Sequence, residues 1–199
     1  MYVAGSTFWE EAAIYFGNAA ELFSGAVFVT PEGTALWAGV TSFSGNIASN
    51  GDGGAVYTRG HCSFTAASMF CANVATKDGG TLFISNGEVY WDDDVLFFNN
   101  TANSGGTILL IDCSKFGLTG ESNFSSNTAD SDGDAVRSTP FEESDYNNSN
   151  YDNFSDSSTA ATAEESEVVF KDSTNFIDNK AGANGGGMAL LCTCRWCST

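Results

Sequence analysis

Residues 70–83 read FCANVATKDGGTLF, and residues 97–110 read FFNNTANSGGTILL, which is nearly the same phrase. Each opens on Phe, carries Asn three residues later and reaches a glycine pair just beyond. The Phe and Asn positions recur every 27 residues, as Phe43, Phe70, Phe97 and Phe124 with Asn46, Asn73, Asn100 and Asn127. Tyr15 with Asn18 and Phe176 with Asn179 extend the series. A fixed period of this length is typical of a repeat protein.

The apolar residues inside each unit have the spacing of β-strands. A large apolar residue stands six positions before each aromatic, namely Trp9, Trp37, Phe64, Trp91, Leu118 and Phe170. In most units another apolar residue precedes it by two, which is the period of a strand with one buried face. The glycine-led segment after each Asn, such as GGTLF at 79–83, indicates a further strand. We therefore predict two or three short strands in each unit and very little helix.

A unit of this size cannot bury its own hydrophobic face, but stacked copies can. Identical units about 4.8 Å apart form parallel sheets around a shared core. The sequence thus predicts an all-β parallel β-helix (β-solenoid) of about six rungs, each near 27 residues. In that fold the structural ladder Phe43, Phe70, Phe97, Phe124 and Phe176 points inward. The ladder Asn46, Asn73, Asn100, Asn127 and Asn179 occupies a corner, where each amide bonds its own turn and its copy in the next rung.

Two segments depart from the period. Residues 138–166 are acidic and rich in Ser, Asn and Asp, and we interpret them as a loop inserted into a single 1–199 domain. A degenerate rung with Tyr151 in the Phe column is the alternative. At the other departure, Cys194 and Trp196 continue the columns of Cys62 and Trp37, so we expect a fragment of a longer solenoid or a protomer that stacks end to end.

The paired motifs resemble a known family. GGAVY and GGTLF, with FSGN, FCAN, FFNN, FSSN and FIDN, are similar to the GGA(I/L/V) and FxxN repeats of the chlamydial polymorphic outer membrane proteins (Pmp). The similarity covers residues 9 to 196 apart from 138–166. The resemblance implies a right-handed, pectin-lyase-like β-helix displayed outside the cell as an autotransporter passenger and used in adhesion.

Composition restricts the partners. Seven Lys and Arg against 25 Asp and Glu give a net charge of −18, which repels nucleic acid and anionic membranes. The first residues show no signal peptide, and no stretch is long and apolar enough to insert into a membrane. The resemblance implies an extracellular or cell-surface location, and we expect the partner to be a glycan or another protein.

Enzymatic function is weakly supported by the sequence. A polysaccharide lyase needs a basic residue beside carboxylate-bound Ca²⁺, and the few Lys and Arg residues are scattered. A glycoside hydrolase needs converging carboxylates, for which Asp92, Asp93 and Asp94 are the best local run, although a solvated turn explains them more simply. We interpret His61, in RGHCSF, as a surface turn residue.

Cofactor signals are equally sparse, and the prediction is none. Calcium is the candidate kept open, because Asp130, Asp132 and Asp134 alternate beside a glycine, although the closing Glu of a calcium loop is absent. Cys62 falls in an apolar column and is expected to act as a small hydrophobe. For Cys192, Cys194 and Cys197 we favour a disulfide or free thiols over a metal site, because one triplet of cysteines lacks the second half of such a site.

The predicted binding surface lies on the glycine-led strands. Their inward positions are aliphatic, so the alternating positions point outward: Phe28, Tyr57, Phe83 and Leu109. Stacked on neighbouring rungs, they would form an exposed apolar stripe for sugar rings or a protein. The alternatives are that residues 138–166 or further chain cover the stripe, or that the assignment of inward and outward is one residue off.

The sequence therefore predicts a non-catalytic surface scaffold for adhesion. The alternatives are a polysaccharide-acting enzyme of the pectin-lyase-like class, recognised by its products, and a self-assembling fibre element, recognised by concentration-dependent elongation.

Overall fold

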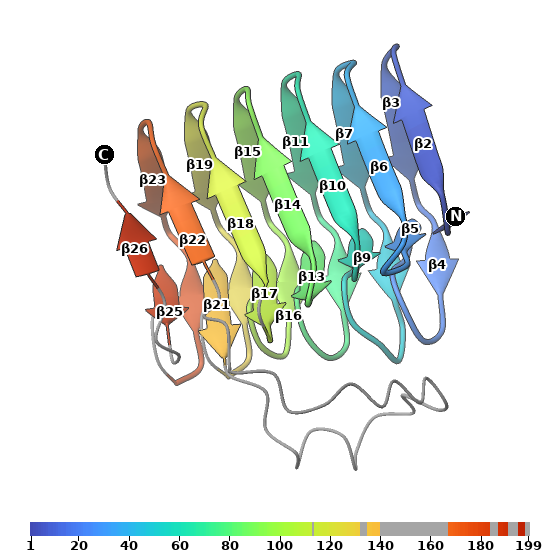
Figure 1. The fold of residues 1–199 in the computed structure, drawn as a ribbon. Coiled ribbons are helices and arrows are strands. Elements are labelled where there is room, and N and C mark those ends of the chain that lie inside the picture. Colours follow the sequence, from blue (N-terminus) through green and yellow to red (C-terminus); the bar gives the residue numbers. More distant parts are fainter. Residues whose placement is uncertain (113, 132–134, 140–166, 184–186, 191–194, 198–199) are drawn as a thin grey trace, which may run out of the picture.

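The computed structural model describes residues 1–112, 114–131, 135–139, 167–183, 187–190 and 195–197, and these coil into a parallel β-solenoid (Figure 1). The predicted fold class is confirmed, with rungs of about 27 residues. The hand of the coil stays a prediction. Each full rung contributes one strand to each of four parallel sheets in the described chain, more than the two or three strands expected.

Two sheets have seven strands each. Sheet A contains β1 (Tyr2–Val3), β5 (Val27–Val29), β9 (Val56–Thr58), β13 (Leu82–Ser85), β17 (Ile108–Ile111), β21 (Val136–Thr139) and β25 (Met188–Leu190). Sheet B contains β2 (Ser6–Trp9), β6 (Thr34–Trp37), β10 (His61–Phe64), β14 (Glu88–Trp91), β18 (Lys115–Leu118), β22 (Glu167–Phe170) and β26 (Arg195–Cys197).

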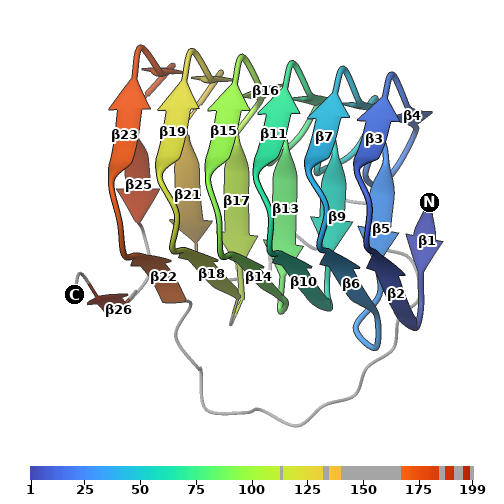
Figure 2. The ribbon, with the colours of Figure 1, turned by 90° about the horizontal axis from the view of Figure 1, so that it is seen from above.

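The other two sheets have six strands each, and Figure 2 shows how strands of successive rungs line up along the solenoid. Sheet C contains β3 (Ala13–Phe16), β7 (Thr41–Ser44), β11 (Ser68–Cys71), β15 (Val95–Phe98), β19 (Ser122–Ser125) and β23 (Thr174–Ile177). Sheet D contains β4 (Ala19–Ala20), β8 (Ile47–Ala48), β12 (Val74–Ala75), β16 (Thr101–Ala102), β20 (Thr128–Ala129) and β24 (Lys180–Ala181).

The core is a set of stacked columns. In sheet B, Trp37 pairs with Phe64 and Phe64 with Trp91, with ring centroids 4.4 and 4.6 Å apart. The Phe column of sheet C meets this column edge to face, as in the 5.7 Å contact between Trp91 and Phe97. Offset stacks and edge-to-face contacts are the favoured aromatic geometries. The repeat thus produces one continuous aromatic core.

A further buried column, in sheet D, was not predicted. Ala48, Ala75 and Ala102 of sheet D are at most 2% exposed and form a cluster of their own. The signal is in the sequence, because an Ala follows every ladder Asn by two residues.

The corner between sheets C and D uses a left-handed residue. The position before the ladder Asn has φ between 53° and 63° in each described rung: Gly17, Gly45, Ala72, Asn99, Ser126 and Asp178. Left-handed backbone costs a non-glycine residue about 1–2 kcal/mol. The conformation recurs with different side chains, so the Asn ladder and the flanking sheets impose it.

The two positions of the glycine pair require glycine for different physical reasons, as Gly79 and Gly80 illustrate. Gly79 has φ of 62°, which favours glycine. A Cβ on Gly80 would lie 2.2 Å from the carbonyl oxygen of Gly106 in the next rung, so no side chain fits. One glycine therefore makes the turn and the other permits close stacking.

The insertion predicted at 138–166 falls, in chain order, between β21 of sheet A and β22 of sheet B. Its first two residues, 138 and 139, belong to β21, so that boundary was wrong, and residues 140–166 lie outside the described part of the chain. β19 pairs directly with β23, with Phe124 opposite Phe176. No further rung separates the two strands, which excludes the alternative with Tyr151 in the Phe column.

The register predicted for the last strand was wrong by two residues. β26 pairs with β22 so that Trp196 stands opposite Val168, in the column of Cys62 and not in that of Trp37. Residues 192 and 194 lie outside the described residues.

No helix in the described part of the chain is long and apolar enough to cross a bilayer.

Candidate functional site

The buried polar feature of the solenoid is the Asn ladder. Asn73 Nδ2 donates to Asn100 Oδ1 and to the carbonyl oxygen of Phe43, both at 3.0 Å. Asn73 Oδ1 accepts from the backbone N–H of Asn46 at 3.1 Å and from its Nδ2 at 2.9 Å. Each amide therefore joins neighbouring rungs, and the four ladder residues Asn46, Asn73, Asn100 and Asn127 are 0% exposed.

The ladder continues to Asn179, which accepts from both nitrogens of Asn127. Beside it, Phe43, Phe70, Phe97, Phe124 and Phe176 stack with centroids 4.6 to 5.1 Å apart. The first four rings are 0% exposed. These residues are in place to hold the scaffold together, and none of the four offers a surface to a ligand.

The stripe predicted for ligand binding is stacked but covered. Phe28, Tyr57, Phe83 and Leu109 stand opposite one another on the outer side of sheet A, as the alternation predicts. Tyr57, Phe83 and Leu109 are only 2–4% exposed, and Phe28 is half-buried. The expectation of an exposed platform was therefore wrong at these three residues.

These residues are buried because they belong to a second hydrophobic cluster on the outer side of sheet A. Phe23 and Ile111 pack against the stripe, and the ring of Phe23 lies 5.1 Å from Phe28 and 5.3 Å from Tyr57. Burial also raises the pKa of the Tyr57 hydroxyl, and the nearby carboxylate of Asp52 adds to the rise. Alternation gives the direction of a side chain, but packing by other segments decides its exposure.

An exposed apolar surface does exist, on the outer side of sheet C, where sequence reasoning did not look. Its outward residues alternate with the ladder residues, so Met69 and Cys71 flank Phe70, and Leu96 and Phe98 flank Phe97. Met69, Leu96 and Phe98 are 41%, 37% and 42% exposed. The sequence contained the signal for this surface, because these residues directly precede and follow each ladder Phe and must therefore point outward.

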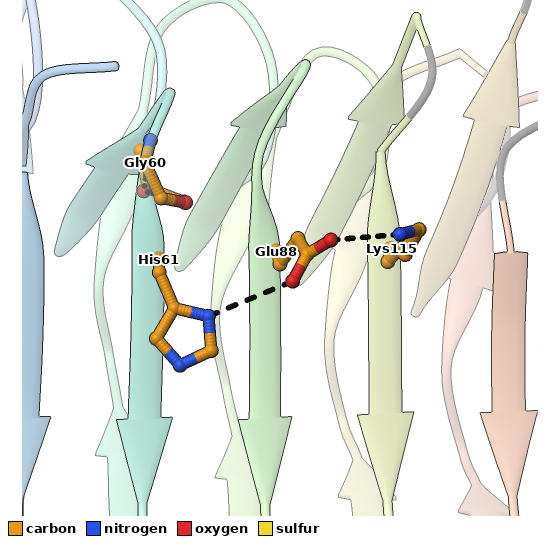
Figure 3. Close-up of polar contacts among 5 residues, drawn as sticks. Gly60, His61, Glu88 and Lys115 are labelled. Atoms are coloured by element: carbon orange, nitrogen blue, oxygen red, sulfur yellow. Dashed lines mark hydrogen bonds and ion pairs between the residues drawn. The ribbon is translucent and has the colours of Figure 1, made fainter. Parts of the chain in front are cut away.

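A row of charged side chains lies on the outer side of sheet B, at the start of successive strands (Figure 3). Lys115 Nζ donates to Glu88 Oε1 at 2.8 Å, and His61 Nδ1 lies 3.7 Å from Glu88 Oε2. The hydrogen bond from Lys115 holds the pKa of the Glu88 carboxyl below its usual value, with charge attraction from Lys115 and His61 adding to the effect. Glu88 thus stays ionised near neutral pH and is a poor general acid.

His61 is the first residue of β10, so its assignment to a turn was wrong, although it does face outward and is 42% exposed along its side chain. Tyr90 lies beside it, with ring centroids 6.0 Å apart, and covers the space above Gly117. Through Glu88, the contacts of Lys115 and His61 link three adjacent rungs.

The remaining candidates stay dispersed. Asp92, Asp93 and Asp94 are exposed between β14 and β15. The described residues contain no cluster of three or more His, Cys, Asp or Glu side chains that could hold a metal ion. Asp130 is exposed, and Asp132 and Asp134 lie outside the described residues, so the calcium prediction is untested. Cys62 is a buried free thiol whose pKa is raised to about 12 by burial.

Comparison with known proteins gives one match. Residues 40–59 match the Chlamydia polymorphic membrane protein (Chlamydia_PMP) repeat. This segment contains Phe43 with Asn46 and the glycine-led strand β9, which are the parts that recur along the chain. No curated protein and no solved structure matches the chain.

Proposed function

We propose that this protein is a non-catalytic scaffold displayed at the cell surface and that it acts in adhesion by binding a protein or glycan of another surface. The observation that carries the proposal is the match of residues 40–59 to the Pmp repeat. The elements within the matched residues, β7 with its ladder Phe and the glycine-led strand β9, pair with equivalent strands of neighbouring rungs. A Pmp-repeat solenoid is consistent with the passenger of an autotransporter.

The geometry supports the same function. Among the described polar side chains, the ladder Asn residues are occupied by hydrogen bonds between rungs, and Glu88 is paired with Lys115 on the outer face of sheet B. Polysaccharide lyases and glycoside hydrolases need a free base or converging carboxylates in a concave site. A rigid column with long outer faces suits recognition of a surface.

The test is binding without turnover. The purified chain, labelled at its amino terminus, should bind cultured cells saturably, and heat-denatured chain should not. Pectin, alginate and similar polymers incubated with the chain should yield no new reducing ends or unsaturated products. Appearance of such products would replace the proposal with a polysaccharide-acting enzyme.

Location is tested separately. Antibodies raised against the chain should label intact cells of the source organism, and external protease should remove the label. Concentration-dependent elongation in light scattering, without any cell binding, would favour a self-assembling fibre element.

A further inference from the structure

The outer face of sheet C is free of charge, in a protein of net charge −18. Its outward positions, two on each strand, are Ile14, Phe16, Ser42, Ser44, Met69, Cys71, Leu96, Phe98, Asn123, Ser125, Asn175 and Ile177. Apolar side chains alternate here with Ser and Asn, and Asp, Glu, Lys and Arg are all absent from these positions. The neighbouring face of sheet B, by contrast, carries the row from His61 to Lys115.

The centre of this face is an apolar patch, which we define as Met69, Cys71, Leu96 and Phe98. Met69 stands opposite Leu96 and Cys71 opposite Phe98 on the adjacent strands β11 and β15. Ser42 and Ser44 border the patch on one side, and Asn123 and Ser125 on the other. Large apolar side chains left exposed next to one another mark a surface that binds a partner.

One margin of the patch is acidic. Asp92, Asp93 and Asp94 precede β15, Glu121 precedes β19, and all four are exposed. The backbone N–H of Glu121 donates to Asp94 Oδ1 at 3.0 Å, which ties the two turns together. The first outward residue of β15, Leu96, follows Asp94 by two residues, so the acidic run leads directly into the strand that carries the patch. We define these four residues as the acidic margin.

Resting on the adhesive function proposed above, we infer that the apolar patch binds a segment of another protein whose apolar side chains are flanked by Lys or Arg, with the basic groups over the acidic margin. Charge complementarity supports this partner, since the whole chain carries only seven basic residues against 25 acidic ones. A second copy of the chain would bring equal negative charge toward itself.

The side chains of the patch favour protein over glycan. Met69 and Leu96 are aliphatic and flexible, and such side chains adapt to the irregular surface of an apolar partner. Phe98 is the one aromatic ring in the patch on which a sugar could stack.

The probe is a short synthetic peptide with a Leu-Phe-Leu centre flanked by lysines, and its control is the same peptide with glutamates in place of the lysines. The lysine peptide should bind the full chain, more weakly as salt is raised, and the glutamate peptide should not. Leu96→Ser and Phe98→Ser should each weaken binding by about tenfold. Ile47→Ser is the matched control, because Ile47 is equally exposed at 41% but belongs to sheet D.

Asp93→Asn should weaken binding less and flatten its salt dependence. Equal binding of both peptides, or unchanged binding by Leu96→Ser, would overturn the inference. Binding of a neutral oligosaccharide to the same patch, or dimerisation lost in Phe98→Ser during sedimentation, would replace the partner with a glycan or a second copy. If Leu96→Ser still binds cells like the unaltered chain, the adhesive function stands and the assignment to sheet C fails.

Discussion

The outer faces of sheets A and C follow the same rule of alternation and end in opposite states. On sheet A, Phe83 is 2% exposed beneath neighbouring apolar residues. On sheet C, Leu96 of the same coil of chain is 37% exposed. Both residues point away from the core and both are apolar. The difference shows that a solenoid face becomes available to a partner only where no other segment packs over it.

The largest difference in stability is expected between substitutions of two adjacent residues of β15, Phe97 and Phe98. Phe97→Ala should lower the free energy of unfolding by about 3–5 kcal/mol, because it opens a cavity between rings 5.1 and 4.6 Å away. Phe98→Ala, on the outer side of the same strand, should cost about 1 kcal/mol or less. Urea denaturation followed by tryptophan fluorescence measures both. Equal losses would mean that inward and outward are misassigned.

The next effect tests the comparison of the two outer faces directly. Phe83→Ala should cost about 3 kcal/mol, because the ring is buried against Tyr57 at 4.8 Å. Leu96→Ala should cost less than about 1 kcal/mol, because much of its side chain already meets water. Midpoints and slopes of urea denaturation give the two values. A larger loss for Leu96→Ala than for Phe83→Ala would contradict the assignment of a buried outer cluster to sheet A and an open face to sheet C.

The sequence predicted the repeat, the core columns and the Asn corner, because each depends on one side chain repeated at one spacing. It missed sheet D, since two-residue strands such as Ile47–Ala48 show no alternation. It also missed the burial of Tyr57 and the charged row through Glu88. Both depend on residues brought together from neighbouring rungs or from other segments, which a periodic pattern does not report.

A smaller effect should separate an inner amide from an outer one. Asn73→Ala should cost about 2 kcal/mol, because it leaves the buried N–H of Asn46 without its acceptor and removes the bond to the carbonyl oxygen of Phe43. Asn123→Ala removes only one exposed bond, from Asn175 at 3.0 Å, and should cost about 0.5 kcal/mol or less. Thermal unfolding monitored by circular dichroism compares them. If both lose equally, the ladder would owe its stability to packing of the rings alone.

The smallest effect concerns charge on the third outer face, that of sheet B. Lys115→Ala should lower stability at pH 7 by about 0.5 kcal/mol, as for other exposed ion pairs, since both partners are about 40% exposed. The folded pKa of Glu88 lies below its usual value of 4.5, so this stabilisation is present above pH 4.5 and is lost as the pH falls through the folded pKa.

The unfolding free energies of the Lys115→Ala variant and the unaltered chain should therefore converge once the pH falls below the folded pKa of Glu88. Lys171→Ala is the control, because it removes the same charge from an exposed position. Its stability relative to the unaltered chain should not change as Glu88 becomes protonated. A difference for Lys115→Ala that persists at acid pH would assign its effect to packing of the lysine stem along β18. The outer face of sheet B would then resemble that of sheet A, where contact with neighbouring residues and not charge decides the stability.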